Sequence, residues 1–411
     1  MTTYLQGVTV VVTTSRGTGF ADQTAQLPEV LDWFRHMREA DPVSWDEHYG
    51  AYHVFRYADI EKVLSDPVTF SSDLTGLIPK QEEIELFSRG NFVRMDPPKH
   101  TKMRRLVSKA FTPRVVAELA PRIAGITNRL LDDVAGQGEF DLVQALAYPL
   151  PVTVIAELIG VPADDRDRFR RWADGLLDAQ VPDTVIPDEK MMQQAGARFR
   201  DMIDYLLAHI RDRRAHPADD LTNALIQAEV DGEKLTDEEI VGFLGVLLIA
   251  GHITTTTLLT NTVLCLDEHP LAAAALRGDP ARIPAALEEV LRYRSPFPRL
   301  ARLTTTDTTV AQRLVPAGKV LMLWLASGNR DGAQFVEPDA FHIDRSPNPH
   351  LSFGHGIHFC IGAPLARLEG RIAMEILLRR TTDLRVADGV QTYDPRIMTG
   401  AKYLPLRTLW T

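Results

Sequence analysis

The chain has 411 residues, of which 45% are hydrophobic and 24% charged, and its formal net charge is -10. These values are ordinary for a globular protein, so we expect residues 1–411 to form one large domain with a sizeable core. The negative charge, without a basic stripe or tail, argues against nucleic acid as a partner. Only two cysteines, Cys265 and Cys360, are present, which excludes a disulfide framework and indicates a reducing compartment.

Residues 1–22 contain only a short apolar patch, and no run of about eighteen consecutive apolar residues occurs in the chain. We therefore expect a cytoplasmic protein without a membrane anchor. Strand-like segments, such as residues 51–55 and 319–324, are few and scattered, whereas helical patterns dominate residues 113–270. The pattern predicts a mainly α fold with small β-sheets.

A segment at residues 96–104, DPPKHTKMR, is typical of a loop that enters a helix. His100 and Arg104 are four residues apart, so their side chains point the same way from a helix. By themselves they fit an ordinary exposed pair. The nearby basic residues fit a solvated charged face; these are Arg105, Lys109 and Arg114.

A long buried helix is predicted to begin after Thr236, which forms a capping box with Glu239. The apolar run at residues 240–249 continues past residue 260, and a helix that is apolar almost all round runs through the middle of a protein. Its centre, residues 250–257, reads AGHITTTT, where threonine hydroxyls can bond to preceding carbonyls. Without other motifs, this pattern fits a core helix that carries no chemistry.

The most informative segment is residues 353–362, FGHGIHFCIG. Its glycines allow a tight turn and the close approach of a flat ligand. Cys360 lies just before a helix N-terminus, which favours an anion and lowers the pKa of a thiol, so we expect a thiolate. The helix is predicted from Pro364 in its first turn and from apolar residues at three- and four-residue spacing, namely Leu365, Leu368, Ile372 and Ile376.

These residues match every fixed position of the pattern Phe-Gly-x-Gly-x-His/Arg-x-Cys-x-Gly, and on this motif the chain resembles the cytochrome P450 family in its soluble bacterial branch. The resemblance covers nearly the whole chain and implies a helical bundle around haem b with small β-sheets. It also implies that the Cys360 thiolate is the axial ligand of the haem iron. The cofactor-binding residues that it implies in the loop are Phe353, Gly354, His358, Cys360 and Gly362.

Two other interpretations of Cys360 stay open at this point. A single cysteine is most often a small buried hydrophobe. Cys360 could also join His350, His355 and His358 at a zinc ion. Zinc sites, however, usually draw paired ligands from two places in the chain, and the sequence has no second Cys/His pair.

The resemblance gives further basic residues a role at the haem. His100 and Arg104 are implied to reach the haem propionates, where charge-assisted bonds to carboxylates are strong. Arg299, in the segment SPFPRLAR at residues 295–302, is also implied to face a propionate, with Arg302 as the nearby competitor. All of these residues are expected to bind the cofactor rather than to react.

Three residues are implied to be structural. A spacing of three puts Glu289 and Arg292 on one helix face, where they can pair, although such pairs are common on surface helices. In the family, this pair and an arginine at the position of Arg345 hold together the chain around the haem loop.

The family's motif on the oxygen side, Ala-Gly-x-Glu/Asp-Thr, falls on the long helix. Ala250, Gly251 and Thr254 are the implied catalytic residues, with the Thr254 hydroxyl bonding the distal oxygen. Ile253 stands where the family has its acid, so the carboxylate that supports the proton relay is missing. We hypothesise that water, ordered by Thr254 or by an inward-facing His252, or a substrate hydroxyl replaces that acid.

The implied substrate pocket is mostly apolar, so we expect a largely hydrophobic substrate held by few polar contacts. Any one of its side chains is more often plain core. The family favours a polyketide or macrolide-like secondary metabolite. The implied substrate-binding residues are Leu77, Ile78, Leu176, Leu247, Ala250, Phe297, Leu300, Met398 and Thr399.

The predicted function is that of a haem-thiolate monooxygenase, which inserts one oxygen atom from O2 into a hydrophobic small molecule. The resemblance implies electrons from a ferredoxin and its reductase, and we expect a monomer. One alternative is a haem-thiolate enzyme with other chemistry, such as epoxidation, coupling or peroxide-driven oxidation. Peroxide-using relatives tend to carry an arginine and a proline near the distal threonine, and this chain has neither there. A non-catalytic haem-binding protein is the other alternative, although such relatives typically lose the cysteine.

Overall fold

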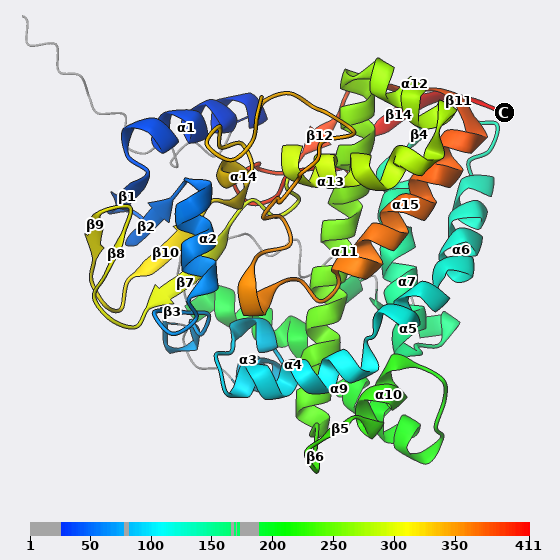
Figure 1. Ribbon diagram of the computed structural model, residues 1–411. Helices are drawn as coiled ribbons and strands as arrows, with labels where there is room; N and C mark the ends of the chain where they lie inside the picture. The colour runs from blue at the N-terminus through cyan, green and yellow to red at the C-terminus, as the bar shows by residue number, and fades with distance from the viewer. Residues whose placement is uncertain (1–25, 78–81, 166–167, 170, 173–188) are drawn as a thin grey trace, which may run out of the picture.

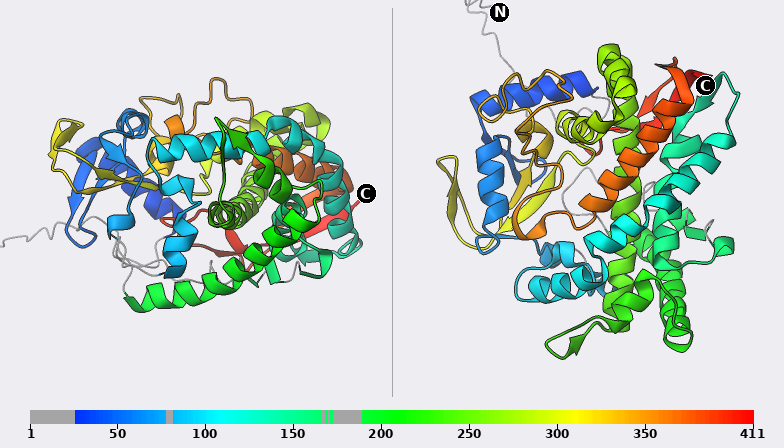
Figure 2. Two further views of the ribbon diagram at one scale, coloured as in Figure 1. Left: turned by 90° about the horizontal axis from the view of Figure 1, so that it is seen from below. Right: turned by 45° about the vertical axis from the view of Figure 1, so that its right-hand side comes forward.

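The structure is a computed structural model that describes residues 26–77, 82–165, 168–169, 171–172 and 189–411. Helices gather around one long central helix, and a five-stranded sheet with its own helices lies to one side of them (Figure 1). The turned views in Figure 2 show helices on several sides of the central helix. The prediction of a mainly α fold with small sheets is confirmed.

Helices form most of the described chain. The α-helices are α1 (Leu27–Ala40), α2 (Tyr57–Ser65), α3 (Glu82–Ser88), α4 (Lys99–Ala110), α5 (Pro113–Glu118), α6 (Ala120–Asp132), α7 (Pro149–Ile159), α9 (Glu189–Ala215), α10 (Leu221–Gln227), α11 (Asp237–Glu268), α12 (Pro270–Gly278), α13 (Ile283–Tyr293), α14 (Leu325–Gly328) and α15 (Ala363–Arg380). Short 3-10 turns include η1 (Thr75–Leu77) and η6 (Gly356–His358). Among the described residues, the helical pattern expected over residues 113–270 corresponds to helices α5 to α11.

Two sheets carry most of the strands. The larger has the order β1-β2-β10-β7-β3, in which only the β2–β10 pair is parallel. Its strands are β1 (Val43–Asp46), β2 (Ala51–Val54), β3 (Phe70–Ser71), β7 (Leu300–Thr304) and β10 (Val320–Leu323). The second sheet has three strands in the order β11 (Thr381–Val386), β14 (Pro405–Trp410) and β4 (Glu139–Asp141). The remaining strands form two-stranded pairs, which are β5 (Glu229–Val230) with β6 (Glu233–Lys234), β8 (Thr308–Val310) with β9 (Arg313–Val315) and β12 (Gln391–Thr392) with β13 (Ala401–Tyr403). Both strands predicted from the sequence, β2 and β10, are confirmed.

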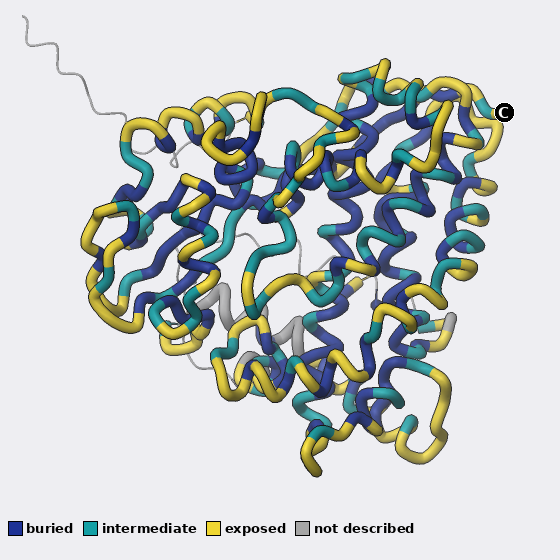
Figure 3. Tube along the Cα trace, in the orientation of Figure 1, coloured by how far each residue is buried: buried dark blue, intermediate teal, exposed yellow. Residues whose placement is uncertain are grey.

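The central helix α11 begins at the predicted capping box. Glu239 N donates to Thr236 Oγ1 at 3.2 Å, and Thr236 N donates to Glu239 Oε2 at 2.8 Å. Within the described residues, α11 is the one helix long and apolar enough to cross a membrane, but 72% of its apolar window is buried inside the protein. Figure 3 shows this burial along the helix, which is that of a core element.

Close packing of other elements fixes α11 in place. It contacts α7, α15, α9 and α3. At Gly242 an added Cβ would lie 2.5 Å from Gly90 N and from Phe87 O, so only glycine lets the chain after α3 cross α11 this closely. The cysteine loop at residues 353–362 leads into α15, and in Figure 1 it lies between the larger sheet and α11.

Candidate functional site

The cysteine loop, residues 353–362, is closed on itself. Cys360 N donates to Phe353 O at 2.9 Å, which joins the two ends of the loop. Gly356 has a φ of +69°, and a Cβ on it would lie 2.7 Å from Leu64 O of α2. Glycine is therefore required where the loop turns against α2, and the tight turn predicted from the sequence is present.

Protein atoms surround the Cys360 thiol on several sides, yet the residue is exposed. Burial raises the pKa of this thiol, while the N–H groups of Gly362 and Ala363 and the charge of Arg104 act in the opposite direction. The lowered pKa that was expected from the helix N-terminus is therefore wrong for the protein without a metal ion, because desolvation outweighs the N–H groups at the start of α15. A reachable thiol with donors around its sulfur fits a bond to a metal ion, which would replace the proton.

Basic side chains gather beside this loop. The ring centroids of His100 and His358 are 4.2 Å apart, and Arg104 Nη2 donates to Phe359 O at 2.7 Å. Burial, followed by the charges of His100, Arg302 and Arg104, lowers the pKa of His358 to about 3. The fold thus concentrates donors and positive charge next to Cys360.

Several of these donors lack a partner among the residues that the structure describes. Both ring nitrogens of His100 and Nη1 of Arg104 are buried without a hydrogen bond. A buried donor left unpaired costs about 1–3 kcal/mol, and carboxylates are strong acceptors for imidazole and guanidinium groups. A flat metal-binding group with carboxylate arms, such as haem b, would supply both the metal for Cys360 and the acceptors for this cluster.

Arg299 has different surroundings. Its guanidinium carbon lies 5.5 Å from the centroid of the Trp324 ring. Trp324 is itself held, since its Nε1 donates to His53 Nδ1 at 2.9 Å. Burial lowers the pKa of Arg299 to about 10, which leaves it charged at neutral pH. An anion beside Arg299 would therefore meet a cation whose orientation an aromatic face supports.

The middle of α11 is open on one face. Ala250 is exposed and Gly251 and Thr254 are half-buried, whereas Ile253 is only 4% exposed. Thr254 Oγ1 donates to Ala250 O at 2.7 Å, as expected for a helical threonine. The three residues predicted to be catalytic thus share the accessible part of this helix, and Ile253 packs into the core.

Glu289 lies at the centre of a buried network. Arg292 donates to its two oxygens at 2.8 Å each, and Arg345 donates at 3.0 and 3.1 Å. Burial opposes ionisation most strongly, but the bonds from Arg292, His342 N and Arg345 hold the pKa of Glu289 below its usual range. Arg292 also donates to the carbonyls of Asn329, Pro338 and Ala340. The structure therefore ties α13 to the chain that leads into the cysteine loop.

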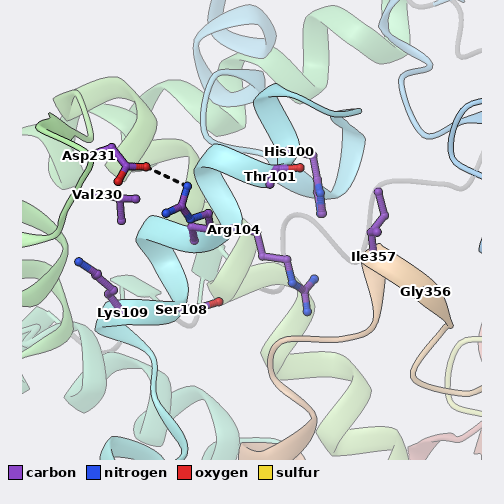
Figure 4. Close-up of a pocket in the computed structure, with 10 residues that line it drawn as sticks. His100, Thr101, Arg104, Ser108, Lys109, Val230, Asp231, Gly356 and Ile357 are labelled. Atoms are coloured by element: carbon purple, nitrogen blue, oxygen red, sulfur yellow. Dashed lines mark hydrogen bonds and ion pairs between the residues drawn. The ribbon is translucent and has the colours of Figure 1, made fainter.

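A cavity of about 680 Å³ lies between α4, the cysteine loop and the β5–β6 hairpin (Figure 4). Figure 4 shows Val230 and Asp231 of the hairpin on one side of the view and Gly356 and Ile357 of the cysteine loop on the other, with α4 between them. The lining of the cavity includes His100 and Arg104 and none of the residues predicted to bind substrate. The hairpin is held to α4 by an ion pair of 3.0 Å between Arg105 and Asp231.

Comparison with known proteins agrees with this geometry. The family model for cytochrome P450 matches residues 20–395. The chain belongs to the cytochrome P450 family. Its cofactor is accordingly haem b, and it is a monooxygenase that acts on a small molecule with O2 and with electrons from a redox partner.

Two curated relatives and one solved structure illustrate the similarity. Erythromycin C-12 hydroxylase of Saccharopolyspora erythraea is 46% identical over 392 residues, which cover 94% of this chain and 96% of the relative. Cyclomarin C epoxidase CymV of Salinispora arenicola is 44% identical over a region that covers 90% of this chain and 94% of the relative. The chain in the solved structure of a mutant of P450 EryK in complex with erythromycin B is 44% identical in sequence, with a TM-score of 0.86. The match covers 93% of this chain and 96% of that chain.

Hydrogen bonds tie Thr399, one of the predicted substrate residues of this P450, to the segment before Phe297 and to α11. Thr399 N donates to Pro296 O at 3.1 Å, and Asn261 Nδ2 of α11 donates to Thr399 O at 2.9 Å. Phe297 is 42% exposed, whereas Leu247, Met398 and Thr399 are buried and Leu77 and Leu300 are half-buried. Ile78 and Leu176 lie outside the described residues.

Sequence reasoning missed Glu369. This carboxylic acid is 1% exposed in α15 of the P450, where burial raises its pKa to about 8, and Thr255 of α11 is the polar neighbour that acts against the shift. The spacing along the helix could have revealed it. Glu369 is four residues after Leu365 and three before Ile372, so it lies on the apolar face of the helix. A buried acid of α15 therefore lies beside Thr255 of α11, the residue that follows Thr254.

Proposed function

We propose that this P450 hydroxylates a hydrophobic secondary metabolite of the polyketide or macrolide type, and that Cys360 would hold its haem iron. The observation that carries the proposal is the accessible Cys360 thiol in a closed loop beside buried, unpaired donors of His100 and Arg104. The similarity to erythromycin C-12 hydroxylase over nearly the whole chain supports the substrate class.

Each part of the site has a role in this proposal. When bound, haem supplies the iron at which dioxygen is reduced and from which one oxygen atom passes to the substrate. Cys360 binds the iron as a thiolate, and the N–H groups of Gly362 and Ala363 stabilise its sulfur. The carboxylates of the haem would be held by side chains with nitrogen donors, namely His100, Arg104, Arg299 and His358.

The protons come from water or from the substrate. Ile253 is buried and apolar, so α11 carries no carboxylate at this position. His252 is a poor substitute, because its ring packs edge-on against Tyr148 with 4.2 Å between the centroids. We therefore assign Thr254, whose hydroxyl lies on the accessible part of α11, the task of ordering a water molecule or a substrate hydroxyl that would supply the proton.

Coupling efficiency, the product formed per reducing equivalent consumed, tests this proton route. Ile253→Glu should raise the coupling efficiency with substrates that bring no hydroxyl to the site. It should change the coupling efficiency little with a substrate whose own hydroxyl already lies there. Ile253→Gln, which has a similar size and no titrating group, is the matched control. If Ile253→Glu leaves coupling unaltered with every substrate, proton delivery does not depend on the missing acid.

The electron donor in this proposal is a ferredoxin that docks on the exposed face of α4. Exposed basic side chains lie on α4 and at the start of α5: Lys109 donates to a backbone carbonyl, whereas Lys102, Arg105 and Arg114 are paired with acidic side chains. An acidic partner would be attracted to Lys109 and would compete with those carboxylates for the other three cations. We further propose that residues 1–411 form a single domain that works as a monomer in the cytoplasm.

Spectroscopy of the purified haem protein tests the ligand. The reduced protein under carbon monoxide should show the long-wavelength Soret band of a thiolate ligand, and Cys360→Ser should abolish it. Cys265→Ser is the matched control, because Cys265 is fully buried in α11, and it should keep the band. Retention of the band in Cys360→Ser would exclude Cys360 as the ligand.

The substrate is then sought with a panel of macrolides and polyketides. Binders should shift the resting Soret band and be oxidised in the presence of a ferredoxin and its reductase. Members that carry a C=C bond test a second candidate, epoxidation, which the similarity to cyclomarin C epoxidase CymV favours. Product analysis separates hydroxylation from epoxidation, and binding without turnover of any member would overturn both.

A further inference from the structure

Asn261 of α11 is a buried amide that joins two segments far apart in the sequence. Its side chain is 0% exposed, and its Nδ2 donates to Arg294 O, just after α13, at 3.1 Å. The same nitrogen donates to Thr399 O, in the turn between β12 and β13, at 2.9 Å. Its Oδ1 accepts no hydrogen bond from the residues that the structure describes. The two N–H groups of one side chain therefore hold two carbonyls against the central helix.

The face of α11 that carries Asn261 is the face that is accessible near the predicted catalytic residues. Positions 250, 254, 257 and 261 are three or four residues apart, so their side chains lie in one row along the helix. Ala250 is exposed and Thr254 half-buried, whereas Thr257 and Asn261 are 0% exposed. The turn covers the row at this point, because a Cβ on Gly400 would lie 2.7 Å from Thr257 Cγ2. The turn therefore borders the accessible part of α11.

The two segments that Asn261 holds are also bound to each other. Thr399 N donates to Pro296 O at 3.1 Å, which joins the turn to the segment after α13. Phe297 and Met398, two of the predicted substrate residues, are the sequence neighbours of these bonded residues. Loss of the amide would release the joined segments, and both side chains with them, from α11.

We propose that Asn261 is a positioning residue, which holds two walls of the substrate pocket in place beside the accessible face of α11. The inference rests on the proposed function, because it takes this face as the side on which a ligand of the haem iron lies. Asn261 is fully buried and acts through Phe297 and Met398. A wall that is already ordered costs no conformational entropy when an apolar ligand packs on it. The amide therefore favours ligands large enough to reach the walls.

Two imidazole ligands of different size test the proposal on the purified haem protein without any turnover. Imidazole and 4-phenylimidazole both bind haem iron through a nitrogen, and the shift of the Soret band measures each dissociation constant. The phenyl ring alone reaches beyond the iron to the walls. Asn261→Asp keeps the shape and replaces both donors by an acceptor. It should weaken binding of 4-phenylimidazole by about 5- to 10-fold and binding of imidazole by less than about twofold.

Thr262→Val is the matched control on the same helix. Thr262 is 2% exposed, and its hydroxyl donates to Leu258 O of α11 itself at 2.7 Å. The control thus loses a buried hydrogen bond without releasing another segment, and it should bind both ligands as the wild type does.

The difference between the two ligands decides the outcome. The proposal is overturned if Asn261→Asp changes both affinities equally, changes neither, or binds 4-phenylimidazole more tightly. If Asn261→Asp does not fold, Asn261→Ala makes the same comparison without adding a charge. The thiolate Soret band of the wild type under carbon monoxide reports on the proposed function separately.

Discussion

Arg345 Nε donates to both carboxylate oxygens of Glu289, at 3.0 and 3.1 Å, across 56 residues of chain. Arg292 donates to the same oxygens, and the side chains of Glu289 and Arg292 are fully buried. One carboxylate therefore pairs with two cations and joins α13 to the chain before the cysteine loop.

Glu289→Gln is expected to lower the free energy of unfolding by about 3–5 kcal/mol, because Arg292 would remain buried and charged without its counter-charge. Urea unfolding followed by circular dichroism measures the change. Glu118→Gln is the control, since Glu118 is 63% exposed in its pair with Arg114, and its effect should be about 0–1 kcal/mol. Equal effects of the two substitutions would mean that the network adds no stability.

Gly356→Ala should damage the cysteine loop more than Gly354→Ala. The two residues have φ of +69° and +72°, so both alanines carry the same backbone strain of about 1–2 kcal/mol. A Cβ at Gly356 would also lie 2.7 Å from Leu64 O, whereas at Gly354 the nearest atom is His358 O at 3.7 Å. Haem content and melting temperature of the purified variants measure the difference, and identical losses would show that strain alone matters.

Local patterns predicted part of this site because their geometry depends on neighbouring residues. The capping box of Thr236 and the turn at Gly356 follow from spacing and from backbone conformation, and both are present. The pairing of Glu289 with Arg292 also follows from spacing, but the contact with Arg345 required the resemblance to a family.

Desolvation could not be predicted from the sequence. The pKa of Cys360 was expected to fall at a helix N-terminus, but it is raised because protein from distant segments surrounds the thiol. Glu369 went unnoticed because a charged residue on an apolar face of a helix is not marked as buried until α11 covers it.

Thr254→Ala is expected to uncouple oxygen reduction from product formation. Thr254 carries the hydroxyl on the accessible part of α11, so without it the fraction of reducing equivalents that reaches product should fall by about tenfold or more. Thr254→Ser keeps the hydroxyl and should retain most of the coupling. Product and consumed NADPH are measured together; if alanine and serine behave alike, the hydroxyl is not the relevant group.

Glu369→Gln should remove a pH dependence of stability. The folded protein holds the Glu369 proton until its pKa of about 8, whereas the unfolded chain releases it near the ordinary value of 4.5. The folded state therefore binds more protons between these values, so the stability that Glu369 contributes is complete below the unfolded pKa and is lost as the pH rises through about 8.

The shift corresponds to a decline of about 5 kcal/mol across this window. Glutamine has nearly the same shape and does not titrate, so the free energy of unfolding of Glu369→Gln should vary less with pH. Urea unfolding of the holoprotein at several values between about pH 5 and about pH 8 measures both slopes. Glu375→Gln is the control, since Glu375 is on the same helix, pairs with Arg371 and is 32% exposed. If the unfolding free energies of wild type and Glu369→Gln vary with pH in the same way, Glu369 ionises in the folded protein because water or a cation reaches it. Only a carboxylate that is kept dry between α15 and α11 holds its proton at neutral pH.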